Sequence, residues 1–142
     1  MHTRGDFAPA SEAEAQERYQ ALGSVARTVV REATTAMGFD REEFDERVTP
    51  DVLLRVHDAL FASTLAVTVG SMAEFDDWAD GRAESVVVLG SENVEHVTWH
   101  DPPMGEAVAA TFQDQETAAV DTLRRQVFGR VYRDHVRDTR SG

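Results

Sequence analysis

The chain has 142 residues, a length that suits one domain, and 42% of them are hydrophobic, which is enough to form a buried core. It contains no cysteine, which excludes disulfides, cysteine-based zinc sites and thiol nucleophiles. Its 26 acidic residues outnumber its 14 basic residues, all of them arginine, and the net charge is −12 with histidine neutral.

The amino-acid usage is biased as well as acidic. Lysine and isoleucine are absent, and asparagine occurs once, at Asn93. This bias is typical of a GC-rich genome, and surplus carboxylates without lysine indicate a halophilic protein adapted to a salt-filled cytoplasm. The other interpretation is an ordinary acidic protein from a GC-rich mesophile. At molar salt, charges are screened over about 3 Å, so recognition would depend on apolar burial and directed hydrogen bonds.

The sequence predicts a cytoplasmic protein with no membrane segment. Residues 1–10 contain no apolar stretch of signal-peptide length. The longest weakly polar run, residues 59–69, is shorter than the roughly 18 residues that a membrane helix needs.

Three helices are predicted in the N-terminal half. Ser11 and Asp40 are each followed, three residues later, by a glutamate, which is the spacing of a capping box. Thr49 followed by Pro50 is a third start, with proline at the first helical position. Gly38 has the position of a C-terminal stop for the first helix.

The middle of the chain contains one ambiguous segment. Residues 65–69 alternate at period two and include β-branched side chains, so they form either a first strand or the end of the third helix. Ser71 and Glu74 make another capping box, which predicts a short helix with Phe75 and Trp78 on one face.

Three strands and a long helix are predicted in the remainder. The strands span residues 86–89, 94–100 and 107–112, and the tight turns between them favour an antiparallel meander. The helix spans residues 114–137. Its apolar side chains recur at helical spacing: Val120, Leu123, Val127 and Val131.

These elements together predict an α+β fold. It has a helical N-terminal half, a small, mostly antiparallel sheet of three or four strands, and a long C-terminal helix packed on the sheet, with the helices on one face. No internal repeat or long linker divides the chain. We therefore expect a single domain over residues 1–142, with flexible ends at residues 1–10 and 138–142.

One histidine is a candidate for chemistry in the helical half. His57 lies one helical turn from Leu53 and from Phe61, so its ring should be partly buried. It is then either a general base in a pocket or a core-edge histidine with a satisfied hydrogen bond.

Two more histidines, His96 and His100, would share a metal ion if their segment were helical. The Val-Thr-Trp between them favours a strand, which separates the two side chains by about 13 Å, so no metal site is predicted. Asp101 could instead orient the His100 ring for catalysis. The alternative is that both histidines are polar residues on the solvent face of the strand. No nucleotide-binding glycine motif is present, and no cofactor is predicted.

The C-terminal segment is the one basic region of the chain. Residues 122–142 contain six arginines and two aspartates. Four of the arginines recur at i, i+3, i+7 and i+10, which makes one stripe on a regular helix: Arg130, Arg133, Arg137 and Arg140. The stripe either binds an anionic partner (a nucleic acid, an acidic protein or a phosphorylated ligand) or complements the helix dipole and neighbouring acidic helices.

Four segments carry a resemblance to a known family. They are Gly-Ser-Met-Ala-Glu-Phe-Asp-Asp-Trp at 70–78, Val-Thr-Trp-His at 97–100, Ala-Ala-Thr-Phe-Gln-Asp-Gln-Glu at 109–116 and Leu-Arg-Arg-Gln-Val-Phe-Gly-Arg-Val-Tyr-Arg at 123–133. With them, the chain resembles a family of uncharacterised haloarchaeal proteins over nearly its whole length. The resemblance implies a salt-adapted, cytoplasmic protein, and it supplies no activity, ligand or catalytic residue.

The sequence favours a non-enzymatic binding or accessory protein. Its partner would be another macromolecule, contacted through the exposed face of the sheet or through Arg130, Arg133 and Arg137. One alternative is a small metal-independent enzyme or ligand-binding domain with a pocket near one of the three histidines. Another is a nucleic-acid binder through the arginine stripe, which is disfavoured because phosphate contacts weaken steeply with salt.

Overall fold

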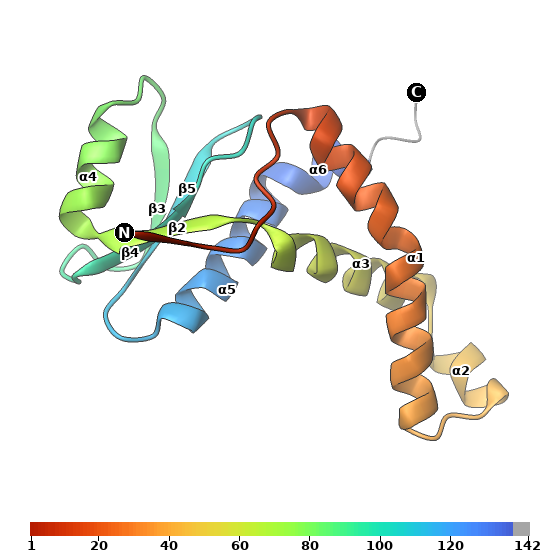
Figure 1. Ribbon diagram of the computed structural model, residues 1–142. Helices are drawn as coiled ribbons and strands as arrows, with labels where there is room; N and C mark the ends of the chain where they lie inside the picture. The colour runs from red at the N-terminus through yellow and green to blue at the C-terminus, as the bar shows by residue number, and fades with distance from the viewer. Residues whose placement is uncertain (138–142) are drawn as a thin grey trace.

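The computed structural model describes residues 1–137 and has one five-stranded sheet. Figure 1 shows the sheet and its helices as a body, from which the far ends of α1 and α3, joined by α2, project as an arm. In chain order the elements are β1 (His2–Arg4), α1 (Glu12–Ala36), α2 (Arg41–Arg47), α3 (Pro50–Thr64), β2 (Val67–Ser71), α4 (Met72–Asp80), β3 (Val86–Leu89), β4 (His96–His100), β5 (Ala107–Phe112), α5 (Glu116–Val127), a π-helical segment (Phe128–Tyr132) and α6 (Arg133–Val136). The predicted α+β class is confirmed, with five strands in place of three or four.

The predicted helix starts are confirmed by their hydrogen bonds. The side chains of Ser11, Asp40 and Thr49 each accept a bond from the backbone N–H three residues later. At Ser71 the reciprocal bond of a full capping box forms as well, because its backbone N–H donates to the carboxylate three residues on. Just beyond α1, Gly38 has φ of 78°, the left-handed conformation that stops a helix.

The strand order is β1-β2-β4-β5-β3, so the predicted meander is wrong. β4 is flanked by β2 and β5, both antiparallel to it, and β3 lies at the edge of the sheet, parallel to β5. A meander needs β3 beside β4, but β2 occupies that side of β4. The ambiguous residues 65–69 fall mostly in β2, because α3 ends at Thr64 and Leu65 is its extended C-cap.

The sequence does not predict β1. Its residues, within the stretch expected to be a flexible end, pair antiparallel with β2. Further along, the Phe7 N–H donates to the Thr64 carbonyl, and the Phe7 carbonyl accepts from Ala66. These bonds fasten the N-terminal segment to the junction between α3 and β2. The other expected flexible end, residues 138–142, lies outside the described residues.

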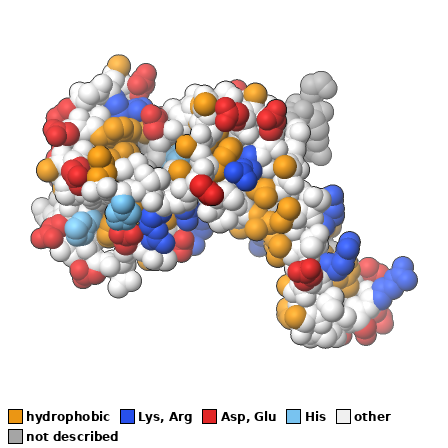
Figure 2. Space-filling view, viewed as in Figure 1, with side chains coloured by type: hydrophobic (Ala, Val, Ile, Leu, Met, Phe, Trp, Pro, Cys, Tyr) orange, Lys and Arg blue, Asp and Glu red, His pale blue; other side chains and the backbone are white. Residues whose placement is uncertain are grey.

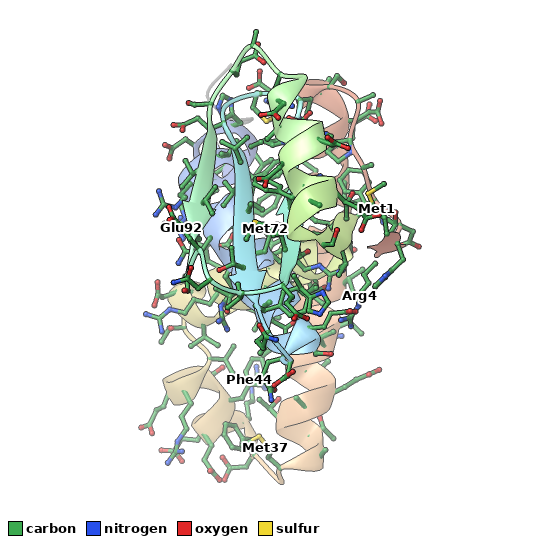
Figure 3. The ribbon with its side chains drawn as sticks, turned by 90° about the vertical axis from the view of Figure 1, so that its left-hand side faces the viewer. Met1, Arg4, Met37, Phe44, Met72 and Glu92 are labelled. Carbon is green, nitrogen blue, oxygen red and sulfur yellow. The ribbon has the colours of Figure 1, made fainter. Side chains whose placement is uncertain are left out.

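Helices cover both faces of the sheet, whereas the sequence pattern predicts one covered face. α1, α3 and α5 pack on one face, around a core that includes Phe61 and Tyr132. α4 packs on the other face, where Phe75 and Trp78 contact Trp99. Figure 3 shows α4 lying in front of the strands on that side. The apolar side of this short amphipathic helix is thereby removed from water.

The C-terminal helix forms as predicted but is not regular throughout. Its predicted apolar stripe is buried: Val120, Leu123, Val127 and Val131. Between α5 and α6, however, Phe128–Tyr132 is π-helical. A π turn contains one residue more than an α turn, so the residues after it are rotated about the axis relative to a regular helix.

The arm comprises residues 22–60. α1 runs outward, α2 forms the tip and α3 returns beside α1, so Met37 and Phe44 lie far from Met72 on α4 (Figures 1 and 3). The arm helices are long, but no helix within residues 1–137 combines the length and the apolar character that crossing a bilayer requires.

One turn against the C-terminal helix permits a test of the packing. Gly105 has φ of 73°, and a Cβ there would lie 2.8 Å from Val131 Cγ1. Gly105→Ala should lower the free energy of unfolding by about 1 kcal/mol for the left-handed backbone and roughly 1–3 kcal/mol for the overpacking. Gly38→Ala is the control, because φ is 78° and no atom lies within 4 Å of its Cβ position. Equal losses in urea unfolding of the two variants would contradict close packing at Gly105.

Candidate functional site

His57 lies where α3 packs on α1. Its ring stacks on Tyr19, with ring centroids 3.8 Å apart, and its Nε2 donates to the Tyr19 carbonyl. It also lines a mostly apolar concavity of about 270 Å³ between the two helices, in which Arg27 is the one other titratable side chain of the lining. The geometry therefore supports the satisfied core-edge histidine, because no carboxylate of that lining could act with it.

His96 and His100 have different surroundings, although they share one side of β4. His96 is partly exposed, and its ring stacks on Phe112. His100 is only 4% exposed, so the prediction of a solvent face is wrong for it. The reason is that helices cover both faces of the sheet. On the side of β4 that carries His100, the cover consists of α5 and the π-helical segment.

The His100 imidazole has hydrogen bonds at both nitrogens. Nδ1 donates to the Ala66 carbonyl at 2.7 Å, and Nε2 accepts from the Tyr132 hydroxyl at 2.6 Å. Burial lowers the pKa of His100, and this outweighs the opposing effects of the Ala66 carbonyl and of Asp101. Burial likewise raises the pKa of Tyr132. The pair is therefore neutral, and it connects the C-terminal helix to the sheet.

Asp101 does not orient His100. Its carboxylate accepts from Arg82 at 2.7 Å, and the Arg82 guanidinium lies over the Trp78 ring. Asp101 and His100 do line one concavity, of about 280 Å³, together with both tryptophans. Since both ring nitrogens of His100 are bonded, the acid–base pair expected from the sequence is not formed. Within residues 1–137, no three His, Asp or Glu side chains are grouped as a metal site requires.

The predicted arginine stripe is divided. Arg130 donates to Gln126 and lines a concavity with Val131 and Asp134. Arg133 lies over the Phe128 ring and lines a different concavity. Arg130 lies within the π-helical segment and Arg133 directly follows it. The two side chains therefore do not have the spacing of a regular helix, which explains why they line different concavities. The fourth member, at position 140, lies outside the described residues.

Arg137 has a partner within the fold. It donates to the Asp58 carboxylate, whose other oxygen accepts from the Tyr19 hydroxyl at 2.8 Å. Burial and the bond to Asp58 raise the pKa of Tyr19 to about 12. This network joins the C-terminal end to α1 and α3, so for Arg137 the pairing with a neighbouring helix is the better interpretation.

A second group of arginines is the feature that the sequence does not reveal. Arg55 of α3, Arg125 of α5 and Arg133 of α6 line one concavity of about 250 Å³. Its apolar lining consists of Ala59, Ala62 and Phe128. No sequence signal connects Arg55 with Arg125, because only the packing of α3 on α5 brings them together. We call this site the arginine concavity.

Tyr132→Phe tests the buried hydrogen bond. It leaves His100 Nε2 without a donor, so the free energy of unfolding should fall by about 1–3 kcal/mol. Thr98→Val is the matched control: Thr98 is fully buried on the same side of β4, and its hydroxyl has no partner among the described residues. This control should be equal to the wild type or more stable in urea unfolding. Similar losses in both variants would show that packing, not the hydrogen bond, determines the effect.

The lowered pKa of His100 predicts a pH dependence of stability. Below its ordinary pKa of 6.5, the unfolded chain binds a proton that the buried imidazole does not. His100 should therefore reduce the free energy of unfolding as pH falls below about 6.5, by at most about 1.4 kcal/mol per pH unit, and have no effect above that pH. Unfolding of the wild type and of His100→Gln, compared between about pH 7.5 and 5.5, checks this. Parallel pH profiles would exclude the predicted titration.

Most of the chain matches a known protein family. Residues 6–133 match DUF5809, a family of unknown function. No curated protein and no solved structure matches the chain. Because the matched residues make up most of its length, the chain belongs to this family of unknown function.

Proposed function

We propose that this protein is a non-enzymatic binding protein whose arm docks on a second protein. The observation that carries the proposal is the exposure of apolar side chains on the arm. Of the seven large hydrophobic residues that are exposed within residues 1–137, five belong to the arm: Val25, Val29, Met37, Val52 and Leu54. Figure 2 shows hydrophobic side chains gathered over α3 and the adjoining part of α1.

Helix geometry places several of these side chains on one side of the arm. Arg27 of α1 and Leu54 of α3 line the same concavity, which marks one side of the helix pair. Side chains two positions apart on an α-helix point about 200° apart. Val25 and Val52 therefore lie on the side opposite to that concavity. Continued at helical spacing, the two rows form an apolar arm face: Val25, Val29, Val52 and Val56.

The charge of the tip favours a basic protein as the occupant. Residues 40–47 contain five carboxylates and two arginines, and α2 has no buried residue. An acidic tip beside an apolar face is complementary to an apolar helix or patch that is flanked by basic side chains. The same tip repels the phosphates of a nucleic acid.

The histidine positions support an enzyme less well. Both ring nitrogens of His100 are bonded within the fold, and His57 donates to a backbone carbonyl. His100 therefore has no free ring nitrogen for a substrate, and the concavity beside His57 has no carboxylate in its lining to act with that ring. A docking surface needs apolar area and charge, and the arm offers exposed apolar side chains beside an acidic tip.

A paired set of variants tests the arm. Val25→Glu combined with Val52→Glu places two carboxylates on the apolar arm face, and burying them should weaken partner binding by about 100-fold or more. Val88→Glu is the control, since Val88 is 47% exposed on β3, outside the arm. Tagged copies are first used to capture the partner from the native host, and Kd is then measured by calorimetry with the purified pair.

Three outcomes would contradict the proposal. One is a partner that binds the arm variant and the wild type equally. Another is a wild-type dimer that becomes a monomer in the arm variant by light scattering, since the face would then bind a second copy. The third is that no captured protein loses its binding in the arm variant. The proposal is supported if Val88→Glu still binds the partner and the arm variant does not.

A further inference from the structure

The arginine concavity is cationic in a chain whose net charge is −12. Arg55, Arg125 and Arg133 reach it from three different helices, and Asp58 is the one carboxylate of its lining. That carboxylate already accepts from Arg137 and from the Tyr19 hydroxyl. The three arginines are therefore not neutralised by the lining itself.

The lining arginines can turn to a ligand at little cost. Arg55 pairs with Asp51 at 3.2 Å, but the two side chains are 80% and 69% exposed. Such surface pairs contribute between about 0 and 1 kcal/mol. Arg125 makes a long contact of 3.5 Å with the Thr122 hydroxyl, and neither Arg125 nor Arg133 forms an ion pair within residues 1–137.

The number of guanidinium groups indicates the kind of anion. One arginine satisfies a carboxylate through two parallel hydrogen bonds. Three arginines on different elements suit a dianion with three acceptor oxygens, which a phosphate monoester provides. The volume, about 250 Å³, is slightly below the usual range for drug-sized ligands, so the ligand is small.

We propose that the arginine concavity binds the phosphate of a small phosphomonoester. The phosphate lies among Arg55, Arg125 and Arg133, and a short apolar ester group lies against Ala59 and Ala62. The site shares no residue with the apolar arm face, so this inference is independent of the proposed docking function. Binding requires the dianion, because the third oxygen and the second charge distinguish phosphate from a carboxylate.

Calorimetry at constant ionic strength tests the site with phenyl phosphate, inorganic phosphate and benzoate as probes. Phenyl phosphate should bind the wild type, and Arg125→Gln with Arg133→Gln should weaken it about 100-fold, roughly tenfold for each arginine. Arg130→Gln is the matched control, because Arg130 is also an exposed arginine of the C-terminal segment but lines another concavity. Arg55→Gln is a second, independent variant on α3. Circular dichroism verifies that all variants are folded.

The pH and the probes distinguish the outcomes. Affinity for phenyl phosphate should fall below about pH 6, where the dianion takes up a proton. Benzoate binding as tightly as phenyl phosphate, absence of phenyl phosphate binding, or an equal loss in Arg130→Gln would each overturn the proposal. If inorganic phosphate binds as tightly as phenyl phosphate, the ester group contributes nothing to binding. That result would overturn the phosphomonoester proposal and identify free phosphate as the ligand. Failure here leaves the arm variants unaffected, so the two proposals are tested separately.

Discussion

A hydrogen bond in the interior, from the Tyr132 hydroxyl to His100 Nε2, ties the C-terminal helix to the central strand. Both partners are buried, and the other ring nitrogen of His100 donates to the Ala66 carbonyl just before β2. Two strands and a helix thus meet at one imidazole. Because an unpaired buried polar group is costly, these elements have to keep their relative positions.

The C-terminal helix contacts His100 through its π-helical segment, which contains Tyr132. The segment ends at Tyr132, and its extra residue rotates the rest of the helix by about 100° relative to a regular one. Arg133 therefore joins Arg55 and Arg125, while Arg130 remains at a different concavity. The local geometry that accompanies the burial of a tyrosine thereby also determines where the cationic side chains lie. Core packing and surface charge are linked in this part of the chain.

Signals between neighbours in the sequence were sufficient for the starts of the capped helices, since a cap such as Ser71 depends on residues three positions away. They did not indicate the π-helical segment of the C-terminal helix. They were insufficient for the sheet order, because alternation at period two does not specify which strand is the neighbour. Alternation placed His100 and Trp99 on opposite sides of β4, but it could not show that both sides are covered. The arginine concavity could not be predicted from the sequence for the same reason, because Arg55 and Arg125 become neighbours only through tertiary packing.

The pairing of β1 with β2 has a consequence for how the chain folds. Residues 2–4 pair with residues 67–69, so a long loop has to close before those hydrogen bonds form. The helices of the arm, by contrast, are close together in sequence and need only short-range contacts. We expect the helical hairpin to form early and β1 to be among the last elements to join. During synthesis, the edge of β2 would then remain open to other strands until the first residues of the chain return to cover it.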